Sequence, residues 1–140
     1  MSSEISCWTS WLSRQVALLA IVFAVAGLLA AATAAQDAPP SVRLTIDYGD
    51  GVQKTFSALE WTEKMTVFAA LQAAEKHPRG IKVRHTGAGE TVFITAIDDL
   101  ANEGQGGKNW RYTVSDKPAR TSAGVAELKA GDTILWRFRQ

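Results

Sequence analysis

Two aromatic and three polar residues in the second half of the chain are the side chains best suited to ligand binding. Trp110 and Tyr112 alternate with polar residues, so in an extended segment both rings lie on one face. The preceding stretch, from Asp98 through Asn102 to Asn109, supplies carboxylate and amide groups. Such a platform suits a flat ring or a sugar face, through stacking and directional hydrogen bonds. The same alternation also fits two core aromatics, so both interpretations stay open for Trp110 and Tyr112.

A second candidate is a set of arginines at the polar positions of the predicted first and last strands. Arg43 lies in the first of these segments, and Arg137 and Arg139 lie in the last. If the two strands are neighbours, the three guanidinium groups form one patch that could meet an anionic glycan or a phosphate-bearing envelope polymer. The alternative is local pairing with Asp47 and ordinary protection of an exposed sheet face.

The residue types and their spacing give little indication of a metal site or a catalytic site. The loop residues Asp98, Asp99, Asn102 and Glu103 are oxygen donors that Ca²⁺ accepts, but their spacing matches no EF-hand, and acidic loop residues are commonly solvated. No pattern in the sequence signals a convergent nucleophile, base and orienting group around His77 or His85. We therefore expect no metal, no cofactor and no enzymatic activity.

The periodicity of the sequence predicts the elements that would position these groups. Apolar residues alternate with polar ones from residue 42 to 48, and a turn at Gly49-Asp50-Gly51 leads into a second extended segment, which predicts a β-hairpin. Thr66 is placed to cap a helix that ends near His77, before Pro78. The remaining segments predicted to be strands are residues 81–84, 91–97, 110–114 and 134–138, with the Gly-rich loop 98–109 between the second and the third.

The order of these elements predicts the fold class. A hairpin, one helix and then further strands, with no internal repeat, fit an α+β domain. We expect a β-grasp-like mixed sheet with the one main helix packed on one face. In that topology the first and last strands are neighbours.

Three stretches, taken together, resemble a known family. They are residues 65–67 at the start of the helix, residues 93–98, and the pair of segments 109–114 and 128–138. This ordered set is similar to the carboxy-terminal domain of transcobalamin and intrinsic factor, in the group of soluble-ligand-binding β-grasp domains. The resemblance covers most of residues 41–140 and implies a β-grasp fold with one side of a cobalamin site, to which the segment around Trp110 contributes. The sequence departs from many relatives at Ser115-Asp116, where they carry Asn-Gly.

The amino-terminal segment has the composition of a targeting sequence. Arg14 precedes twenty uncharged, mostly apolar residues, 16–35, which end in small residues. This pattern predicts a signal peptide over residues 1–35, and the alternative is an uncleaved membrane anchor, in which case residues 16–35 contact the membrane. Residues 36–40 are expected to be a linker and 41–140 the domain. The only cysteine, Cys7, precedes the apolar run, so residues 36–140 have no thiol chemistry.

Composition then limits the possible partners. Fifteen basic and 14 acidic residues give a net charge of +1, which provides no overall field for nucleic acid. We expect an exported protein, secreted or periplasmic, or membrane-anchored with an exported domain. Its expected role is a non-catalytic binding module for a small soluble ligand, cobalamin-like or glycan. The alternative is a structural or adaptor domain of the cell envelope that binds another protein.

Overall fold

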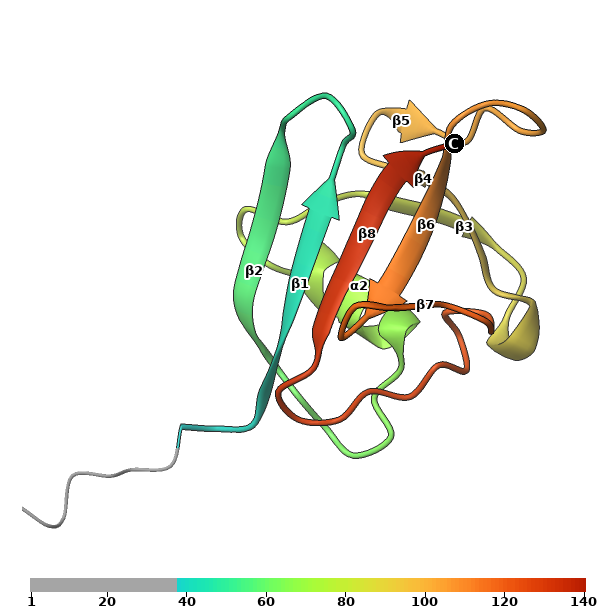
Figure 1. The fold of residues 1–140 in the computed structure, drawn as a ribbon. Helices are drawn as coiled ribbons and strands as arrows, with labels where there is room; N and C mark the ends of the chain where they lie inside the picture. The colour runs from blue at the N-terminus through green and yellow to red at the C-terminus, as the bar shows by residue number, and fades with distance from the viewer. Residues whose placement is uncertain (1–37) are drawn as a thin grey trace, which may run out of the picture. The chain divides into compact units, whose positions relative to one another are not determined.

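The computed structural model describes residues 38–140, of which residues 39–140 form one compact unit. The predicted signal peptide or anchor, residues 1–35, lies outside the described residues. Within the described residues, no helix has the length and apolar character needed to span a membrane. The secondary-structure elements, shown in Figure 1, are β1 (Ser41–Asp47), β2 (Gln53–Glu60), α2 (Val67–Glu75), β3 (Val83–Thr86), the 3₁₀ turn η2 (Gly89–Thr91), β4 (Phe93–Ile97), β5 (Leu100–Ala101), β6 (Asn109–Val114), β7 (Lys117–Pro118) and β8 (Thr133–Arg139).

The strands form two sheets. The larger sheet has the order β2-β1-β8-β6-β7, and the smaller has the order β3-β4-β5. All neighbouring strands are antiparallel except β1 and β8, which are parallel and pair Arg43 with Thr133 and Asp47 with Arg137. The expectation of a mixed α+β fold in which the first and last strands are neighbours is therefore confirmed.

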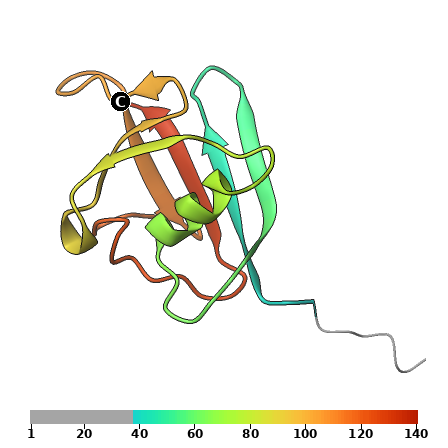
Figure 2. The same ribbon diagram turned by 180° about the vertical axis from the view of Figure 1, so that it is seen from behind.

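The helix and the smaller sheet lie on the same side of the larger sheet, as Figures 1 and 2 show from opposite directions. The helix begins as expected, because the Thr66 hydroxyl accepts a hydrogen bond from the Ala69 N–H at 3.2 Å. Its buried stripe is Val67, Ala70, Leu71 and Ala74. These residues pack with buried strand residues that include Leu44, Ile46, Ile97 and Ile134, and so form one core.

Two strand starts and one loop differ from their prediction. Ile81 is buried as expected but precedes β3, which runs to Thr86. The segment predicted to begin at residue 91 becomes a strand only at Phe93, because the chain first makes the 3₁₀ turn η2. The loop 98–109 contains the short strand β5, which pairs with β4. A two-residue strand carries no detectable alternation, which explains why periodicity could not find it.

Candidate functional site

A groove of about 760 Å³ lies at one end of the domain. It lies between the β1–β2 turn, the residues that precede β3 and the β4–β5 turn. Its lining combines apolar surface with groups of both charges: Tyr48, Asp50, Val52, Gln53, Lys54, Lys82, Asp98, Asp99 and Leu100.

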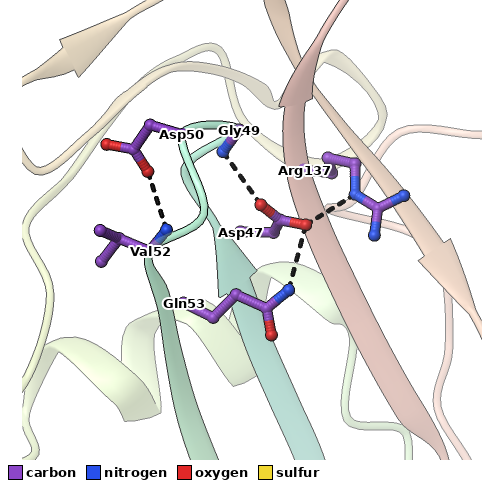
Figure 3. A network of polar contacts seen from close by, with 6 residues as sticks. All are labelled: Asp47, Gly49, Asp50, Val52, Gln53 and Arg137. Carbon is purple, nitrogen blue, oxygen red and sulfur yellow. Dashed lines mark hydrogen bonds and ion pairs between the residues drawn. The ribbon is translucent and has the colours of Figure 1, made fainter.

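The β1–β2 turn is held by two aspartates at its start. Gly49 and Gly51 both have positive φ, which lets the chain reverse within a few residues. The Gly49 N–H donates to the Asp47 carboxylate at 2.9 Å, and the Val52 N–H donates to the Asp50 carboxylate at 2.9 Å (Figure 3). The turn therefore presents Tyr48 and Val52 to the groove from a fixed backbone.

Asp47 also ties this turn to β8. Its Oδ2 accepts hydrogen bonds from Gln53 Nε2 at 3.2 Å and from Arg137 Nε at 2.8 Å (Figure 3). Burial alone would raise the pKa of Asp47, but the hydrogen bonds from Gly49, Arg137 and Gln53 outweigh burial and hold that pKa below its ordinary value. Asp47 therefore stays ionised, and Arg137 is partly neutralised by it.

Asp98, one of the predicted ligand-binding residues, lies in the groove wall and already has several partners. It adopts φ +51°, and its carboxylate accepts hydrogen bonds from the Tyr48 hydroxyl and from the Lys82 N–H, the latter at 2.8 Å. Burial, together with the adjacent Asp98 carboxylate, raises the pKa of Tyr48. Tyr48 therefore remains a neutral donor, and the pair joins β1 to the smaller sheet.

The two predicted asparagines are also occupied by the chain's own backbone. Asn102 Nδ2 donates to the Ile94 carbonyl at 2.8 Å, while its Oδ1 accepts from the Trp110 N–H at 2.8 Å. Asn109 Nδ2 donates to the Gly104 and Gly107 carbonyls, and its Oδ1 accepts from the Gly104 N–H at 3.0 Å. Both amides thus shape the loop between β5 and β6.

The exposed aromatic platform that the sequence allowed is not present. Trp110 is 6% exposed and Tyr112 is 9% exposed, so both rings belong to the core. Trp110 Nε1 donates to the Leu100 carbonyl at 2.8 Å, and its ring lies 5.3 Å from that of Phe138. The Tyr112 hydroxyl donates to the Thr121 carbonyl at 2.8 Å. Burial raises the pKa of Tyr112, and the hydrogen bond to Thr121 opposes that rise only in part.

Trp110 nevertheless lies directly behind the groove. Its ring and that of Tyr48 meet edge to face at a centroid distance of 5.8 Å, and its indole N–H donates to the backbone carbonyl of Leu100. Both Tyr48 and Leu100 line the groove. Of the five residues predicted to bind a ligand, the groove therefore includes Asp98 directly and is supported from behind by Trp110. Asn102, Asn109 and Tyr112 do not line it.

The arginines that lie together in the structure differ from those of the predicted patch. Arg43 pairs with Thr133, four residues before Arg137, which separates it from Arg137 by about 13 Å along the strand. The residue directly opposite Arg137 is Arg111 on β6, and the residue opposite Arg139 is Asn109. The structure places Arg43 apart from the other two arginines of the predicted patch, whereas Arg111 lies directly opposite Arg137. The signal was available, because Arg111 also occupies a polar position in its strand.

The remaining candidates for chemistry are dispersed. His77 packs against Phe56 and His85 packs against Phe68, so the two histidines lie in separate aromatic contacts. Glu103 accepts a hydrogen bond from the Lys108 N–H at 2.7 Å, which closes the loop. Within residues 38–140, no group of three or more His, Cys, Asp or Glu side chains is placed to hold a metal ion.

The fold and the groove define a class: a small α+β domain with a hollow between its hairpin turn and its second sheet. The chain belongs to the family described as "Domain of unknown function (DUF4430)", whose profile matches residues 65–140. No curated protein matches the sequence significantly. The transcobalamin-like assignment is not confirmed by these comparisons.

A solved structure supports the fold. The chain is similar to the crystal structure of a "putative metal binding protein" from Ruminococcus gnavus, with a TM-score of 0.58 and 18% sequence identity. The match covers 72% of this chain and 97% of the other. At this identity the likeness concerns the fold.

Proposed function

We propose that residues 41–140 form a non-catalytic binding module of β-grasp type that holds a small soluble organic ligand in the groove. The observation that carries the proposal is the groove itself. Its volume of about 760 Å³ falls within the range of roughly 300–1,000 Å³ that is typical of small-molecule sites. The strand order, with the first and last strands parallel at its centre, supports the β-grasp assignment.

The chemistry of the groove favours an organic molecule with both apolar and polar parts. Tyr48, Val52 and Leu100 provide apolar surface, and Lys82 and Asp99 provide exposed charges. The related structure is described as metal-binding, but the apolar surface of the groove favours an organic ligand for this chain. A cobalamin-like molecule or a glycan, the ligands expected from the sequence, are the first to test.

The test is a titration of the full-length protein, in a mild non-ionic detergent, with cobalamin and with neutral and acidic oligosaccharides. Tryptophan fluorescence is the readout, corrected for light absorbed by cobalamin, because Trp110 contacts the back of the groove. Val52 is 58% exposed in the groove and Val125 is 41% exposed outside it. We expect Val52→Arg to abolish a saturable change and Val125→Arg to leave it intact.

Two results would overturn the groove as the site. One is binding that Val52→Arg leaves unchanged, which places the ligand elsewhere. The other is the absence of any saturable change across the panel, which favours the adaptor function. We also propose that the domain is exported. N-terminal sequencing of the mature protein distinguishes a signal peptide, which is removed, from an anchor, which is retained.

One observation favours the adaptor function as a second candidate. Strand β2 is eight residues long, and within the described part of the chain it pairs only with β1. Its other edge therefore offers backbone groups to which an extended segment of another protein could add a strand. A photo-crosslinker at Ser57, exposed on β2, would then capture one defined envelope protein, whereas the same group at Glu90 on η2 would not.

A further inference from the structure

The outer face of the larger sheet, away from α2, carries a concentration of positive charge with a hollow beside it. Arg111 on β6 stands directly opposite Arg137 on β8, and Arg139 follows two residues later on the same face. These three arginines line a depression of about 270 Å³ between β8, β6 and β7. Its remaining wall includes Pro118, Ala119 and Leu135, which are mainly apolar.

The three arginines on this face outnumber the carboxylates that form ion pairs with them. Within residues 38–140, Arg137 pairs with Asp47, and neither Arg111 nor Arg139 forms an ion pair. Arg137 uses only Nε toward Asp47, so its two terminal nitrogens are free of that carboxylate (Figure 3). The three guanidinium groups are thus balanced by a single paired carboxylate, that of Asp47. Like charges directly opposite on a sheet are destabilising, so the placement of Arg111 opposite Arg137 adds nothing to the stability of the fold.

The depression has the features of an oxyanion site. A guanidinium is a planar fork of N–H donors that matches a carboxylate or phosphate group. Arg111 also lines a neighbouring hollow of about 520 Å³ against the Gly104–Gly107 loop, so the site continues beyond the depression. The apolar wall at Pro118, Ala119 and Leu135 can contact the carbon skeleton of a ligand that carries such an anionic group.

We propose that Arg111, Arg137 and Arg139 bind the carboxylate or phosphate group of a small organic anion, with its apolar part against Pro118 and Leu135. This site is separate from the groove and does not depend on the function proposed for the groove. Arg43 provides a matched control, because it is an exposed arginine on the same face, about 13 Å from Arg137, and has no ion-pair partner among residues 38–140.

The experiment is a titration of the full-length ¹⁵N-labelled protein in detergent with phenyl phosphate, benzoate, inorganic phosphate and benzamide. The readout is the backbone amide shifts of Ala119 and Leu135. We expect saturable shifts with phenyl phosphate or benzoate, weaker binding of inorganic phosphate, and none with the neutral benzamide. Arg111→Gln should weaken binding about tenfold, the effect of one charge-assisted hydrogen bond. Arg43→Gln should change it by no more than about twofold, because salt screens distant charges.

Several outcomes would overturn the proposal. Equal weakening by Arg43→Gln would show a diffuse charge effect, and unchanged binding in Arg111→Gln would remove that arginine from the site. If benzamide bound as tightly as benzoate, the site would not require a negative charge on its ligand. If the spectrum of Arg111→Gln shows misfolding, Arg139→Gln serves in its place with the same expected loss. Val52→Arg should leave anion binding intact, which separates a failure of this proposal from a failure of the groove.

Discussion

The loop from Asp98 to Asn109 and the outer face of the larger sheet differ in how their polar groups are used. In the loop, Asp98, Asn102 and Asn109 all bond other parts of the same chain. On the sheet face, Arg111 and Arg139 have no ion-pair partner within residues 38–140. The loop drew attention in the sequence because it is rich in polar residues, yet its side chains shape the backbone. The arginines have hydrogen-bonding capacity left for a ligand.

Residue type is therefore a weaker guide to binding than unused hydrogen-bonding capacity. Asn102 and Asn109 bond backbone groups through both ends of the amide, so a ligand there would compete with those bonds. Breaking such bonds costs free energy, because buried polar groups left without partners are penalised.

The largest effect is expected for Trp110→Ala. Because the ring is 6% exposed and packs against Tyr48 and Phe138, its removal leaves a cavity and should lower the free energy of unfolding by about 3–5 kcal/mol. Urea denaturation of the full-length protein measures this value. A variant that stays within about 1 kcal/mol of the parent and yet loses ligand binding would restore the exposed-platform interpretation.

Asn102→Ala is expected to come next. The substitution removes the hydrogen bonds with Ile94 and Trp110, which should cost about 1–3 kcal/mol. Gln105→Ala in the same loop, at an exposed position, is the control and should lie within about 0.5 kcal/mol of the parent. Equal denaturation midpoints for the two variants would contradict a structural role of Asn102.

Asp47→Asn should weaken the link between the β1–β2 turn and β8 by about 1 kcal/mol at neutral pH. Because the pKa of Asp47 is lowered in the folded protein, its stabilisation is complete above the unfolded pKa and is lost as the pH falls through the folded pKa. Thermal denaturation between pH 7 and 2 should therefore show a smaller loss in Asp47→Asn than in the parent. At neutral pH the control Asp99→Asn should keep the parent's midpoint, since Asp99 is exposed.

The smallest effect is expected on the sheet face, and it has the opposite sign. Arg111→Gln removes a like charge opposite Arg137 and should raise the free energy of unfolding by about 0.2–0.5 kcal/mol at low salt. The gain should shrink as the salt concentration rises. A clear loss of stability in differential scanning calorimetry would show that Arg111 is needed by the fold, which would weaken its assignment to binding.

Much of the architecture could be predicted from periodicity. The β1–β2 hairpin, the Thr66 cap and the strands of residues 110–114 and 134–138 all follow from alternation, turn residues and helical spacing. Short elements such as β5 and η2 could not, because they are too short to show a period. The register between β1 and β8 could not be predicted either, since it depends on contacts between residues about 90 positions apart.

The candidate site was harder to predict than the fold, because it also depends on contacts between residues that are far apart in the sequence. Alternation places Trp110 and Tyr112 on one face but does not say which face is covered, and here it is the face under the helix and the smaller sheet. The groove joins Tyr48, Lys82 and Asp98, which are distant in sequence and meet only when two sheets pack. The hydrogen-bond partners of Asn102 are backbone groups, and residue types alone do not indicate such partners.

The parallel pairing of β1 and β8 also has a mechanical consequence. The described chain enters at the start of β1 and leaves at the end of β8, at opposite ends of the sheet (Figure 1). A force that stretches the domain by these two ends pulls the strands past one another. The ladder between residues 43–47 and 133–137 is then loaded all at once, whereas an antiparallel pair held at one end opens bond by bond. The domain is therefore built to resist tension along its own strands.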